Sequence, residues 1–146
     1  MGLGAKATSP PAPTISALSI SNSTSRRWQS LNTAIQLYPK YVEAHNSLGL
    51  VITSSASYRW GSLNFKAAIH IDSKLAAAGY NLGLALRDVA ISSTAGEERA
   101  KLLEDACRAF AEASKLAPDA AKYVGYADRM PEIDSLMNGR GHCPPT

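Results

Sequence analysis

The chain has 146 residues, 45% of them hydrophobic and 18% charged, and this length indicates one domain that can bury a core. The net charge of +3 is unevenly spread, because residues 1–42 hold four basic and no acidic side chains, whereas residues 43–146 hold 11 basic and 12 acidic ones. Such a near-neutral body lacks the concentrated basic face that nucleic-acid binding requires. No apolar run approaches the roughly 18 residues of a membrane-spanning helix. We therefore expect neither nucleic-acid binding nor membrane insertion.

Residues 1–25 contain nine Ser or Thr, three Pro and no acidic residue. This composition is typical of a disordered tail or of an organelle transit peptide, and both interpretations stay open. A third interpretation is an eroded first helix carrying Ile15, Leu18 and Ile20. The expected compartment is the cytoplasm, and the alternative is a chloroplast or mitochondrion reached through the transit peptide.

One apolar stripe recurs at helical spacing, and no segment of the chain indicates a strand. The stripe consists of Leu103, Ala106, Phe110, Ala113 and Ala117. Thr94 stands three residues before Glu97, which predicts a capping box at the start of a helix. We predict helices at about 27–38, 42–54, 58–71, 75–90, 97–116 and 119–129. The last helix caps the domain and ends at Pro131, and residues 131–146 are predicted to form a loose tail.

Leu48-Gly49 recurs 34 residues later as Leu82-Gly83, and the segment RWQSLN at 27–32 is echoed by RWGSLN at 59–64. Self-similarity at a period of 20 to 50 residues indicates stacked repeats rather than one closed globule. The second copy carries 11 extra residues between Leu86 and Ala106. Eleven residues are about three helical turns, so they would lengthen the hairpin without changing its register. The longer hairpin either has no function or protrudes as a partner contact.

The residues that follow each Leu-Gly pair complete the pattern. They are Gly61, Phe65, Ala68 and Ser73 in one copy, and Ala106, Phe110, Ala113 and Pro118 in the next. This pattern resembles the tetratricopeptide repeat family, although Ser73 replaces the usual proline. The resemblance implies an all-α solenoid of α-α hairpins at residues 26–130, with about two and a half repeats. The first helix of the first repeat is not recognisable. The surface around Trp28, Leu31 and Ile35 should then be incompletely covered, so the chain is expected to self-associate or to be stabilised by a partner.

The resemblance also implies a concave groove lined by the first helix of each hairpin. The groove residues that it implies are Asn46, Leu50, Tyr80, Asn81, Leu84, Arg87 and Lys122. Asn side chains can pair with both the N–H and C=O of an extended peptide, and Arg87 could bind a carboxylate bidentately. Some relatives hold the C-terminal carboxylate of chaperones in a basic clamp, but only Asn81 and Lys122 match its positions.

No motif for catalysis is present. The three His residues are far apart, and the acidic pairs on the 97–116 helix alternate with basic residues, which is typical of a solvated face. Cys107 and Cys143 have no metal-ligand spacing, and we expect them unpaired in a reducing compartment. We therefore expect no metal, no cofactor and no enzyme activity.

The expected function is a protein-interaction module, an adaptor or assembly scaffold that binds a peptide or helix in its groove. The alternative is a fragment or diverged relative of the repeat region of an enzyme. Residues 42–50, VEAHNSLGL, resemble in style the arrays that precede the catalytic domain of O-GlcNAc transferases.

Overall fold

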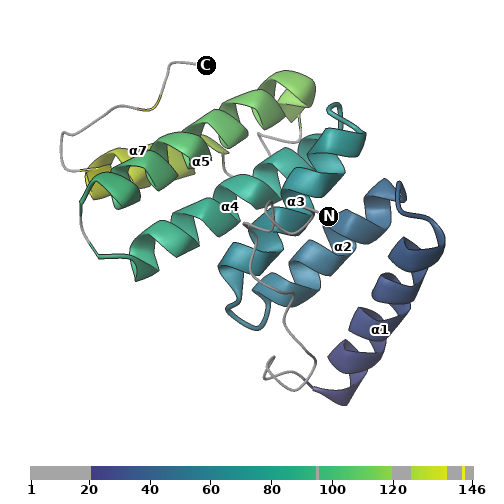
Figure 1. The fold of residues 1–146 in the computed structure, drawn as a ribbon. Coiled ribbons are helices and arrows are strands. Elements are labelled where there is room, and N and C mark those ends of the chain that lie inside the picture. The colour runs from purple at the N-terminus through teal and green to yellow at the C-terminus, as the bar shows by residue number, and fades with distance from the viewer. Residues whose placement is uncertain (1–20, 95, 120–125, 138–142, 144–146) are drawn as a thin grey trace, which may run out of the picture.

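The computed structural model describes residues 21–94, 96–119, 126–137 and 143, with the side chains of the last helix described from residue 131 onward. Every regular element in these ranges is an α-helix and none is a strand, so the prediction of an all-α fold is confirmed (Figure 1). The helices are α1 (Asn22–Leu37), α2 (Val42–Thr53), α3 (Tyr58–Ile71), α4 (Ala76–Ser92), α5 (Glu97–Leu116) and α7 (Tyr126–Met137). The predicted bounds of α2 to α5 agree with these within two residues.

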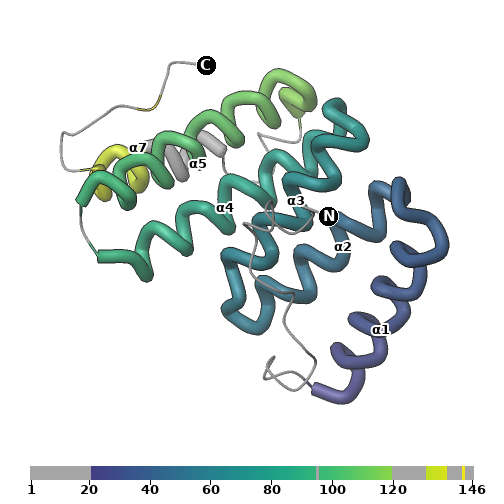
Figure 2. The backbone as a smooth tube through the Cα atoms, viewed as in Figure 1, coloured from purple at the N-terminus to yellow at the C-terminus, as the bar shows by residue number. Residues whose placement is uncertain are grey.

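The helices form a row of antiparallel pairs. α1 packs on α2, α3 packs on both α2 and α4, and α5 packs on α4 and on α7. α2 and α4 also contact each other, so the first helices of the two hairpins are neighbours. The tube in Figure 2 runs back and forth from α1 at one edge to α5 and α7 at the opposite edge.

Two glycines set the close approach within the hairpins. A Cβ atom on Gly49 would lie 2.5 Å from the ring of Phe65, and one on Gly83 would lie 2.6 Å from the ring of Phe110. Both distances are shorter than real contacts allow, so each aromatic ring occupies the space that a side chain on the partner helix would need. Both rings are almost fully buried. The same glycine–phenylalanine contact therefore closes both hairpins, with the two glycines 34 residues apart.

The second hairpin is longer than the first, as predicted. α4 and α5 contain 17 and 20 residues, against 12 and 14 in α2 and α3. The two connecting segments, 54–57 and 93–96, are equal in length, so all of the extra residues lie in the helices. The predicted capping box at Thr94 is wrong. The N-cap is Gly96, which places Glu97 at the first helical position, too early to pair with a threonine cap.

α1 begins at Asn22, five residues before the predicted start. The Ser21 hydroxyl caps it by accepting a hydrogen bond from the backbone N–H of Thr24 at 3.4 Å. α1 ends before Tyr38, because Pro39 disfavours helical conformation at the preceding residue. Residues 22–25, assigned from composition to the N-terminal segment, are therefore helical. The rest of that segment, up to residue 20, lies outside the described residues.

α7 corrects the prediction for the C-terminal region. The predicted helix at 119–129 lies partly outside the described residues, at 120–125. From Tyr126 onward the described helix does not end at Pro131 but continues through this proline to Met137. A proline inside a helix removes one backbone hydrogen bond. Burial compensates for that loss, since Ile133 is 0% exposed and Met137 is 2% exposed in the core formed with α4 and α5. The predicted loose tail therefore begins too early, and its last residues lie outside the described ranges, apart from Cys143.

The two cysteines are joined, which contradicts the expectation that they are unpaired. A disulfide links Cys107, fully buried on α5, to Cys143, with their Cα atoms 5.3 Å apart. The backbone N–H of Cys143 also donates a hydrogen bond to Asp134 on α7 at 3.0 Å. Their separation of 36 residues gives no spacing signal, because the bond joins α5 to a residue beyond the end of α7.

Candidate functional site

The candidate binding face lies on α2 and α4, the first helices of the two hairpins. Asn46 on α2 and Asn81 on α4 meet directly: the Asn81 Nδ2 donates a hydrogen bond to the Asn46 Oδ1 at 3.1 Å. Both side chains are half-buried. The side-by-side packing of α2 and α4 accounts for this contact between residues 35 positions apart.

The amide pair keeps hydrogen-bonding capacity for a ligand. Within the described residues, the hydrogen bond between the two side chains leaves the Asn46 Nδ2 group and the Asn81 Oδ1 atom unused. One is a donor and the other is an acceptor, which are the two groups needed to pair with a peptide C=O and N–H. Because each amide orients the other, the pair presents these groups in a preset geometry.

Two predicted leucines flank the amide pair. Leu50, one turn after Asn46 on α2, has 47% of its surface exposed. Leu84, three residues after Asn81 on α4, is half-buried and packs against the core. An exposed leucine beside a polar amide pair offers a ligand apolar contact next to hydrogen bonds.

The ring of Tyr80 does more than line the predicted groove. Its ring centroid lies 5.4 Å from that of Phe110, with the planes tilted by 58°. This is the range in which aromatic pairs attract each other. The half-buried side chain therefore supports the core of the second hairpin while part of its surface stays exposed.

Arg87 is already engaged by acidic residues of the chain itself. Its Nε and Nη2 atoms donate to the Asp88 carboxylate at 2.9 and 2.8 Å, and its Nη1 atom lies 3.6 Å from the Glu132 carboxylate on α7. Only 14% of the Arg87 side chain is exposed. The sequence could not show the contact with Glu132, because α7 brings that residue to α4 from 45 residues away. An incoming carboxylate would have to displace these contacts. Lys122, the seventh predicted groove residue, lies outside the described residues.

A groove that the sequence did not predict lies on the opposite side of α4, between α3 and α5. This hollow has a volume of about 370 Å³. It has an apolar floor that includes Leu75, Leu82 and Leu86, and a rim of Lys66, Asp105, Arg108 and Glu112. Asp105 and Arg108 form an ion pair with each other at 3.2 Å, so the rim is balanced in charge. No periodicity in the sequence indicated this groove, because it lies where α3 and α5 both pack against α4.

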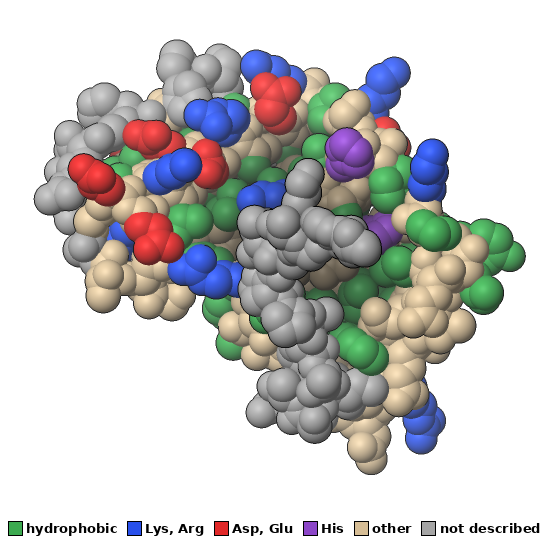
Figure 3. All heavy atoms as spheres, viewed as in Figure 1, with side chains coloured by type: hydrophobic (Ala, Val, Ile, Leu, Met, Phe, Trp, Pro, Cys, Tyr) green, Lys and Arg blue, Asp and Glu red, His purple; other side chains and the backbone are tan. Residues whose placement is uncertain are grey.

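The charged side chains are distributed along the row of helices. In Figure 3 acidic and basic side chains are mixed over α5, whereas the surface over α1 shows basic and hydrophobic side chains but no acidic ones in this view. Within the described ranges, no group of three or more His, Cys, Asp or Glu residues is placed to hold a metal ion. No helix in the described part of the chain has the length and apolar character needed to cross a membrane.

Comparison of the sequence with protein-family models and with curated protein sequences found no match. Function is therefore inferred from the geometry of the helices and from the side chains that they expose.

Proposed function

We propose that this chain is a tetratricopeptide-like hairpin array that acts as a non-catalytic protein-interaction module, an adaptor or assembly scaffold. The repeated contacts of Gly49 with Phe65 and of Gly83 with Phe110 support a stacked-hairpin architecture, because each closes one hairpin in the same way. Stacked hairpins align their first helices into one extended surface, and such surfaces commonly bind peptides.

The observation that carries the proposal is the amide pair between Asn46 and Asn81. An extended peptide lying across α2 and α4 would donate an N–H to the Asn81 Oδ1 and accept from the Asn46 Nδ2. Leu50 would contact an apolar side chain of the peptide. Recognition of this kind uses the peptide backbone, so it does not require an acidic partner, and Arg87 keeps its internal ion pairs.

This function can be tested with peptides that are selected from a displayed random library for binding to the protein, whatever their sequence. The affinity of each selected peptide is measured by fluorescence anisotropy for the native protein and for Asn46→Ala and Asn81→Ala. Loss of one backbone hydrogen bond should weaken binding by about 1 to 3 kcal/mol, which is roughly fivefold to 150-fold. Lys66→Ala and Glu112→Ala, both on the groove between α3 and α5, are the matched controls and should have no effect. The proposal fails if the control variants weaken binding and the asparagine variants do not.

We also propose that the protein resides in an oxidising compartment. The Cys107–Cys143 disulfide favours an oxidising compartment over the cytoplasm expected from the sequence, because cytoplasmic thiols are kept reduced.

A further inference from the structure

α1 carries the packing residues of a second hairpin helix, but no helix in the described structure covers them. Leu31 and Ala34 stand 34 residues before Phe65 and Ala68, so they occupy the same places in the repeat. Phe65 and Ala68 are 1% and 0% exposed, because α2 and α4 enclose α3. Leu31 and Ala34 are only half-buried. Among the described helices α1 packs appreciably only on α2, so no described helix lies on the side where a hairpin partner would be.

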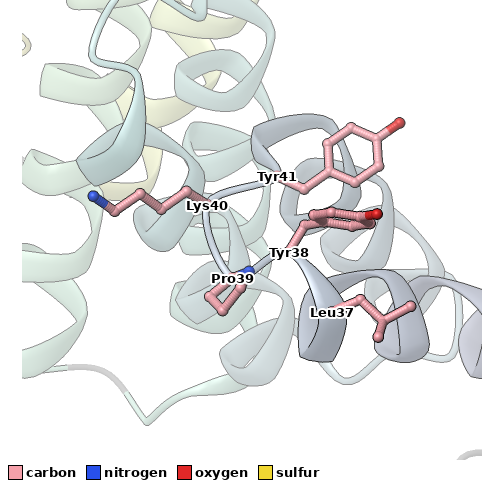
Figure 4. A pocket seen from close by; sticks show the side chains of 5 residues that line it. All are labelled: Leu37, Tyr38, Pro39, Lys40 and Tyr41. Carbon is pink, nitrogen blue, oxygen red and sulfur yellow. The ribbon is translucent and has the colours of Figure 1, made fainter.

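An exposed apolar patch continues this open side at the C-terminal end of α1. The side chains of Leu37 and Tyr38 are 67% and 66% exposed, and Tyr41 is 47% exposed. Figure 4 shows these three side chains pointing to one side of the turn, whereas Lys40 points to the other. Together with Lys40 and Pro39 they line a shallow hollow. Large apolar side chains grouped in this way mark contact sites for other molecules.

The charge of this edge restricts what can cover it. Residues 21–42 contain Arg26, Arg27 and Lys40 and no acidic residue. None of these three has an ion-pair partner among the described residues. Arg27 occupies the repeat position of Gly61, where a Cβ atom would collide with the side chain of Thr53 on α2. A helix that pairs with α1 must therefore accommodate a guanidinium where α2 meets a glycine, and a carboxylate there would neutralise it.

We propose that the edge formed by α1 and the turn at 37–41 is a docking site for an acidic amphipathic helix of a partner protein. The helix packs antiparallel to α1, as α2 packs on α3. It places small residues over Leu31, apolar residues beside Tyr38 and a carboxylate against Arg27. The site is separate from the amide pair of α2 and α4.

Two other occupants are disfavoured by charge. A second copy of this chain would bring the same basic edge against the first if the two α1 helices paired. The N-terminal residues 1–20 carry Lys6 and no acidic residue, so they offer no carboxylate to Arg27. Sedimentation and deletion of residues 1–20 distinguish these two occupants from a partner helix.

A peptide copy of residues 41–57 is the probe, because α2 is the helix that pairs with α3 in the same geometry. One version carries T53E, which places a carboxylate where the peptide would meet Arg27, and the control version carries T53K. Binding of each labelled peptide to the full-length protein is measured by fluorescence anisotropy. The T53E peptide should bind about tenfold tighter than the T53K peptide, and R27E in the protein should reverse this order. Tyr38→Ser should weaken both peptides.

The Asn46→Ala and Asn81→Ala variants separate this site from the peptide-binding face, since they should leave binding of the T53E peptide unchanged. The proposal is overturned if the T53E peptide does not bind at about 1 mM protein, which corresponds to a binding free energy weaker than about 4 kcal/mol. The same holds if R27E leaves the relative affinities of the two peptides unaltered. It is also overturned if sedimentation shows a dimer that R27E dissociates, or if the peptide binds only after residues 1–20 are deleted.

Discussion

At the scale of single residues, Gly79 and Gly83 lie one turn apart on α4 but meet different neighbours. A Cβ atom on Gly83 would lie 2.6 Å from the Phe110 ring, whereas one on Gly79 would lie 3.4 Å from the Cβ atom of Ala113. Gly83→Ala should therefore lower the free energy of unfolding by about 1 to 2 kcal/mol through overpacking. Gly79→Ala should be neutral or raise it by up to about 1 kcal/mol, because alanine favours helix. Urea denaturation of both variants checks this. Equal losses would contradict the assigned contacts.

Tyr80 and Phe110 should be energetically coupled. Phe110→Ala should cost about 3 to 5 kcal/mol because it empties a fully buried site. Truncation of the half-buried Tyr80 to alanine should cost about 1 to 3 kcal/mol, more than that of a ring lying only on the groove surface. A double-mutant cycle measured by chemical denaturation should give a coupling of about 0.5 to 1.5 kcal/mol. Strict additivity would show that the two rings do not support each other.

At the scale of elements, the turn between α2 and α3 contains the one non-glycine residue with positive φ in the described ranges, Ala56 at 61°. A side chain costs about 1 kcal/mol in this left-handed conformation, which glycine avoids. Ala56→Gly should raise the free energy of unfolding by up to about 0.5 kcal/mol, after the greater entropy of the unfolded glycine is subtracted. Thermal denaturation would show a higher melting temperature. Ala77→Gly, on the exposed surface of α4, is the control and should lower it.

The disulfide should stabilise the C-terminal elements. It closes a loop across 36 residues, which is worth about 3 to 4 kcal/mol if its effect on the unfolded chain dominates. Cys143→Ser should lose this stability, and denaturation of the variant should be insensitive to reductant. The native protein should lose a similar amount when reduced. Identical stability of the native protein with and without reductant would contradict this prediction.

The sequence predicted the hairpin helices well, because the residue spacings that specify them lie close together in the chain. The spacing of Leu48-Gly49, Phe65 and their later copies encodes both the helical period and the close approach of the two helices. Two of the predictions that went wrong depend on contacts between distant segments. α7 continues past Pro131 because Ile133 is buried against α4 and α5, and the second acidic contact of Arg87 forms because Glu132 lies on that same helix. Neither contact leaves a periodic signal near the residues concerned.

At the scale of the whole molecule, the two edges of the row differ. α7 packs against α5 and is tied by the Arg87–Glu132 ion pair, with Ile133 in the core. α1 contributes no fully buried residue and exposes Leu37. The C-terminal edge is therefore closed by the chain itself, whereas the described N-terminal edge is left open. Between them α2 and α4 present the Asn46–Asn81 pair, so the two binding sites that we propose lie apart on the row of helices.

The claim that α2 and α4 form a peptide-binding face is tested most directly by nuclear magnetic resonance of the side-chain amides. A library-selected peptide is added to the ¹⁵N-labelled protein, and the Nδ2 resonances of Asn46 and Asn81 are followed, with assignments from Asn46→Ala and Asn81→Ala. We expect both resonances to shift and to saturate together as the peptide concentration rises. Shifts confined to residues of α3 and α5 around the second groove, with both asparagine side chains unmoved, would contradict the claim.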